Sequence, residues 1–273
     1  MKKRTACLFL CVCMLLCLAL PAAAAESGGA GFTDQGQIRN TGAVQMLVDL
    51  GLISGYTDGS FRPASYITRE EVAKLIAILC TENPQAPADV YFYDAQNSWA
   101  LDYIGYCAGQ GIIAGDGMGS FRPKDNVTAQ ELAKMLLVIL GQDPASYSGA
   151  GWDERVNADA QSFGIYYGLT AQVNQPVTRD NACLLIYNAM QCPAVVNAKA
   201  DGVMRYALDA LMNPKTYMEL RFGLVRYTGV LEANECADLT AAGGKLAEGM
   251  SKLAGHKEFA VQTDLKVPDG SET

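Results

Sequence analysis

The sequence predicts a mainly α protein, in which three helix-turn-helix repeats pack around one core and a short tail with β-strands follows. Two observations predict this fold. The segment 55–63, with the sequence GYTDGSFRP, recurs at 115–123 as GDGMGSFRP with its length unchanged. After each copy comes a Thr-x-x-Glu sequence and an apolar run with helical spacing, which is typical of a capped helix start. Self-similarity of this length indicates a repeat architecture.

The register that relates position 55 to position 115 holds without a gap well beyond the turn segment. The matched pairs are Phe32 and Phe92, Asp34 and Asp94, Gly51 and Gly111, Thr68 and Thr128, and Glu71 and Glu131. A third copy is shorter, since residues 177–180 (VTRD) correspond to residues 67–70 (ITRE). The interval from the turn glycine to the threonine runs from 55 to 68 and from 115 to 128 in the first two copies, but only from 168 to 178 in the third. The third copy has therefore lost most of its turn.

Each copy has the pattern of two helices joined by a turn. In the second copy the first helix is expected over about 99–110, and Gly111 ends it in a left-handed conformation. Thr68 and Thr128 then stand at the N-cap of the second helix, and Glu71 and Glu131 occupy the matching capping-box positions. Asn181 replaces this glutamate in the third copy. One such pair of helices cannot bury its apolar face alone, so the three copies should pack together.

Residues 1–25 have the pattern of a secretory signal peptide. Three positive charges precede an apolar run and an alanine-rich cleavage site, with Glu26 expected as the new N-terminus. Their removal changes the net charge from −8 to −11, because three cations and no acids leave. A secreted chain this acidic argues against nucleic acid as a partner, and against a membrane after signal cleavage.

The cysteines and the single histidine give no sign of a cofactor, a metal site or a catalytic centre. Five of the nine cysteines lie beyond the expected signal peptide, at widely spaced positions: Cys80, Cys107, Cys183, Cys192 and Cys236. Neither a disulfide framework nor a zinc site follows from that spacing, although Cys183 and Cys192 could pair. One histidine, His256, cannot serve a Ser/His/Asp set, so we expect a protein that is not an enzyme.

Four motifs, taken from the two copies and given in their order within one repeat, resemble the S-layer homology domain family. They are a Phe-x-Asp opening at 32–34, a Trp-Ala helix start at 99–100, the turn at 55–63 and the Thr-Arg-Glu-Glu start at 68–71. The resemblance places repeats at 30–82 and 90–142, with a degenerate third repeat at 150–192. It implies a pseudo-threefold bundle whose grooves bind secondary cell-wall polysaccharide, often through a pyruvate ketal.

A ketal carboxylate is a fixed anion that favours a guanidinium and free N–H groups at a helix start. Arg69 and Arg179 follow the capping threonines and could offer both, or could simply lie exposed in the first helical turn. Trp99 could stack on a sugar or pack at the edge of the core. The copies differ at these positions, because Ala129 replaces arginine in the second copy and Arg39-Asn40 replaces Trp-Ala in the first. The candidate glycan-binding residues are Arg69, Arg179, Asp34, Asp94, Trp99, Gly55, Tyr56, Gly115 and Thr68.

The resemblance and the signal peptide together predict a secreted protein held non-covalently at the bacterial cell surface. The expected partner is a pyruvylated or other acidic secondary cell-wall polysaccharide, associated with peptidoglycan. Two alternatives remain open at this point. One is a wall-acting glycan hydrolase whose catalytic part lies in the tail, and the other is a self-assembling S-layer protein.

The tail, at 198–273, does not follow the repeat pattern. Residues 201–212 could form a helix, whereas residues 220–231 and 259–265 have strand-like sequences. Strands without partners are rarely stable alone. We therefore expect an α+β tail that is loosely held and is either an incomplete β-rich module or a segment that packs on the repeats or on a partner.

Overall fold

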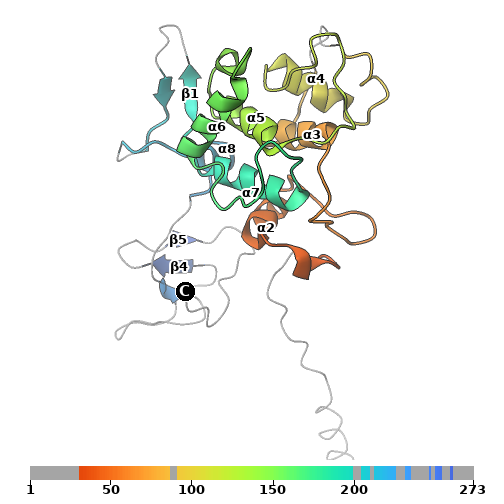
Figure 1. Ribbon diagram of the computed structural model, residues 1–273. Coiled ribbons are helices and arrows are strands. Elements are labelled where there is room, and N and C mark those ends of the chain that lie inside the picture. The colour runs from red at the N-terminus through yellow and green to blue at the C-terminus, as the bar shows by residue number, and fades with distance from the viewer. Residues whose placement is uncertain are drawn as a thin grey trace, which may run out of the picture.

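The computed structural model describes residues 31–86, 91–198, 204–209, 212–225, 231–234, 246, 250–253 and 259–260. The expected signal peptide, Cys236 and His256 lie outside these ranges. The described helices are α2 (Thr41–Asp49), α3 (Arg69–Cys80), α4 (Leu101–Gly109), α5 (Ala129–Ile139), α6 (Trp152–Phe163), α7 (Arg179–Met190) and α8 (Tyr217–Phe222). Two 3₁₀ turns, η2 (Gln35–Gln37) and η3 (Pro144–Tyr147), complete the helical elements. The mainly α prediction is confirmed (Figure 1). In these ranges no helix is long and apolar enough to cross a membrane.

The helices form three units in chain order, which we call the first (α2, α3), second (α4, α5) and third (α6, α7) unit. The two helices of a unit do not make the main contacts with each other. Instead α3 packs on α4, α5 packs on α6, and α7 packs back on α2. The second helix of each unit thus pairs with the first helix of the next unit, and the third unit closes the circle on the first.

Three backbone hydrogen bonds close this circle at its centre. The N–H of Val127 donates to the carbonyl of Ile67 at 3.1 Å, and the N–H of Val177 donates to Val127 at 2.8 Å. The N–H of Ile67 donates in turn to Val177 at 3.1 Å. All three side chains are at most 1% exposed. Because each residue gives one bond and receives one, the arrangement has the pseudo-threefold form that the sequence predicts, which we call the central ring.

The start of each second helix is capped as its sequence predicts. The side chain of Thr68 accepts from the N–H of Glu71, whose carboxylate accepts from the N–H of Thr68, and the same box forms at Thr128. Thr178 accepts from the N–H of Asn181, so the third cap keeps half of the box. These caps satisfy N–H groups that the helices leave without internal partners.

The turn of the first unit is built on buried aromatic packing. Phe61 is fully buried, and its ring centroid lies 5.1 Å from that of Phe32. Phe121 and Phe92 repeat the contact in the second unit at 5.5 Å. The Phe-x-Asp opening of each unit therefore folds under its own turn, which explains why both motifs recur together.

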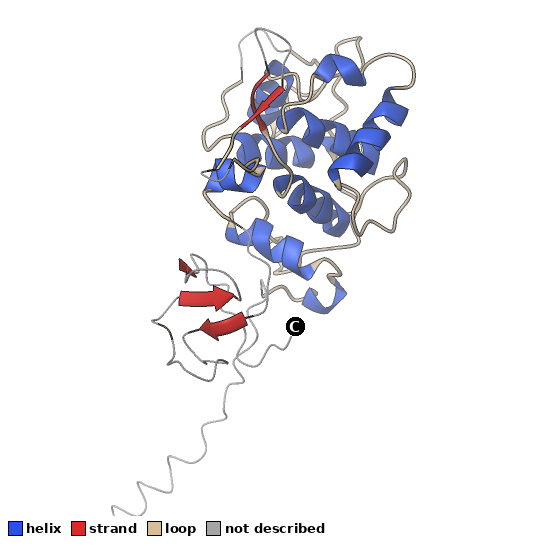
Figure 2. Cartoon of the chain, turned by 90° about the vertical axis from the view of Figure 1, so that its left-hand side faces the viewer, coloured by secondary structure: helices blue, strands red, loops and turns tan. Residues whose placement is uncertain are grey.

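The described strands are short and fall into two groups (Figure 2). β1 (Val195–Ala198) pairs antiparallel with β2 (Met204–Tyr206), and β3 (Leu231–Asn234), β4 (Met250–Leu253) and β5 (Phe259–Ala260) form a three-stranded antiparallel sheet in that order. The helix expected at 201–212 is wrong, because residues 204–206 pair with β1 instead. The strand expected at 220–231 is wrong over its first residues, which belong to α8.

α8 is docked on the helical units by specific hydrogen bonds. Tyr217 Oη and Arg221 Nε both donate to the carbonyl of Leu79, at 3.2 and 3.0 Å, near the end of α3. The N–H of Tyr217 donates to the carbonyl of Cys192 at 2.9 Å, and the Met218 side chain is 3% exposed. The expectation of a loosely held tail is therefore wrong for α8, which links the end of the first unit to the end of the third.

Met218 provides a test of this docking. We expect Met218→Ala to lower the free energy of unfolding by about 2–4 kcal/mol, because it leaves a cavity under α8. Met212 is 72% exposed, and Met212→Ala should change it by less than about 0.5 kcal/mol. Urea denaturation of the two variants and the wild type measures the difference. Equal stabilities would show that α8 does not contribute to the fold.

Candidate functional site

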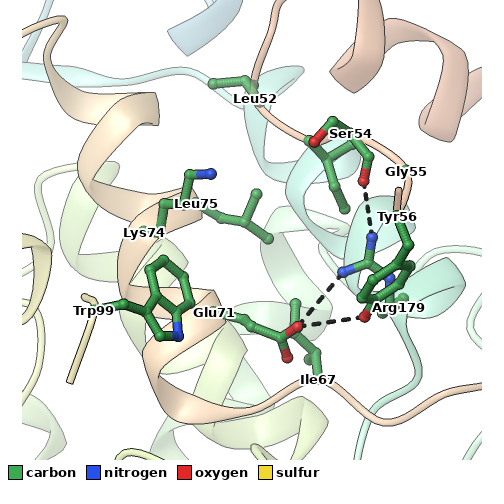
Figure 3. Close-up of a pocket in the computed structure, with 11 residues that line it drawn as sticks. Leu52, Ser54, Gly55, Tyr56, Ile67, Glu71, Lys74, Leu75, Trp99 and Arg179 are labelled. Carbon is green, nitrogen blue, oxygen red and sulfur yellow. Dashed lines mark hydrogen bonds and ion pairs between the residues drawn. The ribbon is translucent and has the colours of Figure 1, made fainter. Parts of the chain in front are cut away.

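A pocket of about 180 Å³ lies where the three units meet (Figure 3). The first unit supplies most of its wall, Trp99 comes from the segment before α4, and Arg179 begins α7. The lining residues are Leu52, Ile53, Ser54, Gly55, Tyr56, Ile67, Glu71, Lys74, Leu75, Trp99 and Arg179. Four of the predicted glycan-binding residues are thereby brought together: Gly55, Tyr56, Trp99 and Arg179.

Arg179 is almost completely buried, at 5% exposed, and two of its three guanidinium nitrogens are fixed by the first unit. Nε donates to the carbonyl of Phe61 at 3.0 Å, and Nη2 donates to the carbonyl of Ser54 at 3.1 Å. The guanidinium lies over the rings of Tyr56 and Phe61. Nη1 is directed toward Glu71, whose Oε1 is 3.8 Å away (Figure 3). One nitrogen of a rigidly held cation therefore remains at the pocket.

The sequence did not single out Glu71 and Lys74 as pocket residues. Glu71 Oε2 accepts from the N–H and hydroxyl of Thr68, as a capping residue does, while Oε1 lies 3.5 Å from the hydroxyl of Tyr56. The Lys74 ammonium lies 5.9 Å from the centre of the Trp99 ring. Two cations, Lys74 and Arg179, and one anion, Glu71, give the pocket a net charge of +1. Glu71 and Lys74 are three residues apart and therefore lie on one face of the helix that follows the capping box. That spacing could have identified both residues.

Arg69 repeats the structural role of Arg179 between the first and second units, and it does not line this pocket. Its Nε donates to the carbonyl of Phe121 at 2.8 Å, and its Nη2 donates to the carbonyl of Ala114 at 2.9 Å. The side chain is buried, and this burial lowers its pKa. Each arginine therefore donates hydrogen bonds to the turn of the next unit around the circle. The sequence had left open that both arginines lie exposed in the first helical turn.

The same geometry explains why two departures from the repeat pattern, one in the second unit and one in the third, occur together. Ala129 stands where an arginine of the second unit would reach the turn of the third unit, and the third turn lacks the Phe-Arg-Pro element. The N–H of Ala129 still donates to the carbonyl of Gln175 at 3.3 Å. The arginine and the turn that it would hold are thus absent as a pair.

The N–H groups at these helix starts are occupied. The N–H of Arg69 donates to the carbonyl of Asp125 at 2.9 Å, and that of Arg179 donates to Ser65 at 2.8 Å. Those of Glu70 and Asp180 donate to carbonyls in the same two turns. The expectation that free helical N–H groups join the arginines in binding an anion is therefore wrong.

Gly55 and Gly115 are required by packing against aromatic rings. A Cβ atom at Gly55 would lie 2.6 Å from Cε1 of Phe32, and one at Gly115 would lie 2.6 Å from Cε1 of Phe92. The sequence analysis placed these glycines among the candidate glycan-binding residues. The structure gives them the role of admitting the Phe-x-Asp aromatic ring.

The carboxylates of Asp34 and Asp94 stabilise the turns of their own units by accepting backbone hydrogen bonds. The two carboxylate oxygens of Asp34 accept from the N–H groups of Phe61 and Arg62, both at 2.8 Å. Asp94 accepts from the N–H groups of Phe121 and Arg122 in the same way. Partial burial raises the pKa of each carboxyl, but these hydrogen bonds outweigh it and the pKa is lowered. All the hydrogen bonds described for these two carboxylates lie within their own units.

The described cysteines are free thiols. These are Cys80, Cys107, Cys183 and Cys192, so the pairing of Cys183 with Cys192 that the sequence left open is not formed. Burial raises the pKa of the Cys80 and Cys192 thiols to about 11. Within the described ranges, no group of three or more histidine, cysteine, aspartate and glutamate side chains is arranged to hold a metal ion.

The family model of the S-layer homology domain matches residues 31–73 and 91–133. These two segments run from the Phe-x-Asp opening of a unit to the first turns of its second helix. The predicted resemblance is therefore confirmed for the first and second units. The third repeat and the signal peptide remain predictions.

Several similar proteins are surface or cell-wall proteins of bacteria. An uncharacterized cell wall amidase of Bacillus anthracis is 36% identical over 125 residues, or 42% of this chain and 24% of its own length. The S-layer protein EA1 of Bacillus anthracis is 31% identical over 35% of this chain and 11% of its own length. The middle cell wall protein of Brevibacillus brevis is 25% identical over 83% of this chain and 22% of its own length. The chain thus spans a quarter or less of each relative. The similarity indicates a location at the cell surface or cell wall, as the sequence predicted.

Arg69 provides a test of the hydrogen bonds that join the first and second units. We expect Arg69→Ala to lower the free energy of unfolding by about 2–3 kcal/mol, because it leaves the carbonyls of Phe121 and Ala114 without their charged donor. Arg122 is exposed and forms a surface ion pair with Asp125, so Arg122→Ala should change the free energy of unfolding by less than about 0.5 kcal/mol. Chemical denaturation of the two variants makes the comparison. Similar losses for both would contradict a special role for the buried arginine.

Asp94 provides a test that depends on pH. Its pKa in the folded protein is lowered, so its stabilising effect is fully present above the usual carboxyl pKa of about 3.9 and is lost as the pH falls through the lower folded value. We expect Asp94→Asn to be less stable than the wild type at pH 7, with the gap closing below about pH 3.9. Thermal unfolding across this pH range measures the gap. A constant gap would show that the carboxylate charge is not what holds the turn.

Proposed function

We propose that the helical units anchor the protein to the bacterial cell wall by binding an acidic glycan non-covalently in the pocket at Arg179. The observation that carries the proposal is how the three nitrogens of the Arg179 guanidinium group are bonded. Two of its nitrogens are fixed by carbonyls, and the third is directed to the pocket with Glu71 at 3.8 Å as its nearest charged partner. A carboxylate of a pyruvate ketal, or another acidic substituent, could accept a charge-assisted hydrogen bond there.

The charges in and around the pocket favour a single small anion over a polyanionic surface. The pocket carries a net charge of +1 from Arg179, Lys74 and Glu71, in a chain whose overall net charge is −8. A long polyanion would be repelled by the rest of the protein, whereas one substituent can reach the local cation. Because Arg179 is already immobilised, little side-chain entropy is lost on binding.

The size of the pocket favours one sugar residue of a polymer. Its volume of about 180 Å³ is smaller than the roughly 300–1,000 Å³ of sites that enclose a whole drug-sized molecule. Trp99 is 55% exposed and offers an aromatic surface on which the apolar face of a sugar ring could stack. The remainder of the polymer would then run outside the pocket.

The other predicted site residues fall into two groups in this proposal. Arg69 has the same two carbonyl contacts as Arg179, so we propose it as the anion contact of a second, equivalent position between the first and second units. Asp34, Asp94, Thr68 and Gly115 would act on the glycan sites indirectly, because their contacts hold the turns and the helix start. The pocket adds Glu71 and Lys74 to the predicted set.

Similarity to known proteins supports wall anchoring and leaves two alternatives to test. Surface-layer and cell-wall proteins are among the relatives, and two units match the S-layer homology domain. The similarity to a cell wall amidase supports a wall-acting enzyme as the second candidate. Release of products from purified wall by this chain, lost on substitution of one carboxylate, would favour the enzyme. Light scattering that shows assembly of the pure protein without glycan would favour an array-forming S-layer protein.

Lys74 provides the sharpest test of the pocket, because Arg179 also holds the first turn and its loss would affect folding. The protein should co-sediment with purified Gram-positive wall sacculi that retain their polymer. We expect Lys74→Ala to weaken this binding roughly fivefold, which corresponds to about 1 kcal/mol for one partly exposed charge contact. Lys215, which pairs with Glu219 away from the pocket, is the matched control, and Lys215→Ala should bind like the wild type.

Two further results decide the proposal. Sacculi from which the polymer has been chemically stripped should not bind the protein, and added salt should weaken binding to the intact sacculi. Binding that persists on stripped sacculi would contradict anchoring through the polymer. Equal binding by the wild type and the Lys74 variant would place the site elsewhere on the chain.

A further inference from the structure

The exposed aromatic ring at the pocket is fixed from behind by a buried carboxylate. Trp99 is 55% exposed, yet its indole nitrogen Nε1 donates to Glu70 Oε1 at 2.8 Å. Glu70 is 3% exposed and belongs to α3, whereas Trp99 belongs to the segment before α4. An exposed tryptophan on a surface segment ordinarily samples several rotamers, and a hydrogen bond at its nitrogen restricts them.

Besides the indole of Trp99, the Glu70 carboxylate contacts two other side chains. It accepts from the hydroxyl of Ser98 at 2.7 Å, and that hydroxyl in turn accepts from the N–H of Ala100 at 3.1 Å. Lys124, from the turn of the second unit, forms an ion pair with the same carboxylate. A buried carboxylate with three partners is held in one geometry, so it can serve as a fixed point for the indole.

The other two units use the equivalent position differently. Gln130 of the second unit contacts Asn157 at 3.4 Å, and Asp180 of the third unit accepts from Asn40 of the first at 3.0 Å. Within the described residues, a carboxylate that holds an indole is therefore specific to the interface beside the pocket. All three contacts tie a second helix to the first helix of the next unit, but only the first one sets a ring at a pocket.

We propose that Glu70 is a positioning residue for glycan recognition, which holds the Trp99 ring as a ready-made surface for a sugar. This inference rests on the proposed function of the pocket. Glu70 itself does not line the pocket, so it acts through Trp99. A ring that is already ordered loses little freedom when a sugar stacks on it, and binding is stronger by that amount.

The test replaces the carboxylate by the residue that the second unit carries at the same position. Glu70→Gln keeps the size of the side chain but leaves one acceptor oxygen in place of two, so it cannot accept from both the Trp99 indole and the Ser98 hydroxyl. It also removes the charge that attracts Lys124. We expect it to weaken binding to polymer-bearing sacculi roughly two- to twelvefold, the range expected from losing the pre-ordering of one side chain. We also expect greater rotational freedom of Trp99, measured by time-resolved fluorescence anisotropy.

The fluorescence requires a single reporter and matched controls. The chain contains two tryptophans, so all variants are made in a Trp152→Phe background and the emission then reports Trp99 alone. Asp159 accepts a hydrogen bond from the hydroxyl of Tyr147 at 2.8 Å in the third unit. Asp159→Asn therefore also removes a carboxylate that holds an aromatic donor, and it should leave the Trp99 anisotropy and the binding unchanged. Glu219→Gln removes a carboxylate that pairs with Lys215 away from the pocket, and it should also leave the Trp99 anisotropy and the binding unchanged.

The outcomes separate this inference from the proposed function. A looser Trp99 together with weaker binding in Glu70→Gln, with both controls like the parent, supports the positioning role. An unchanged Trp99 anisotropy, or a looser Trp99 with unchanged binding, overturns it while the parent still binds. Failure of the parent protein to bind sacculi overturns the proposed function and the positioning role together. A loss of binding in Asp159→Asn as well would assign the effect to general stability and overturn the specific role.

Discussion

The three backbone hydrogen bonds of the central ring are the constraint on which the rest of the structure depends. Ile67, Val127 and Val177 each give one bond and receive one, and each is followed within two residues by the start of a second helix. The ring therefore sets where all three helices begin. Once these starts are fixed, the residues in the first helical turn are directed at the turns of the neighbouring units.

The pocket follows from this exchange of contacts between units. Arg179 reaches it from the third unit, Trp99 from the second, and Tyr56 from the first. A guanidinium buried among carbonyls and aromatic rings would be costly if any of these partners were missing. The groups that stabilise the junction of the units are thus the same groups that give the pocket its charge and its aromatic wall, so folding and recognition are difficult to separate at Arg179.

The sequence predicted the local structure well, since the capping boxes at Thr68 and Thr128 and the shortened third turn all have the expected form. The sequence left open whether Arg69 and Arg179 lie exposed, and their burial could not be read from it, because helical periodicity describes a helix and says nothing of a neighbouring unit that covers its first turn. The start of α8 carried the same signal as the other helices, a threonine followed by glutamate at 216 and 219, but the expected β-rich tail hid it. The contact of Glu70 with Trp99 joins residues 29 positions apart and depends on the packing of α3 against α4, which a repeat pattern does not reveal.

Ala129 stands in place of an arginine and the third turn is shortened, so the junction between the second and third units differs from the other two junctions. A buried arginine holds two of the three junctions, whereas the junction between the second and third units has backbone hydrogen bonds, helix packing and the contact of Gln130 with Asn157. That junction therefore lacks the buried guanidinium that the other two junctions contain. Because each of these arginines belongs to one unit and the carbonyls that it holds belong to the next, a single unit cut out of the chain would lose the partners of its arginine, the arginine that holds its turn, or both.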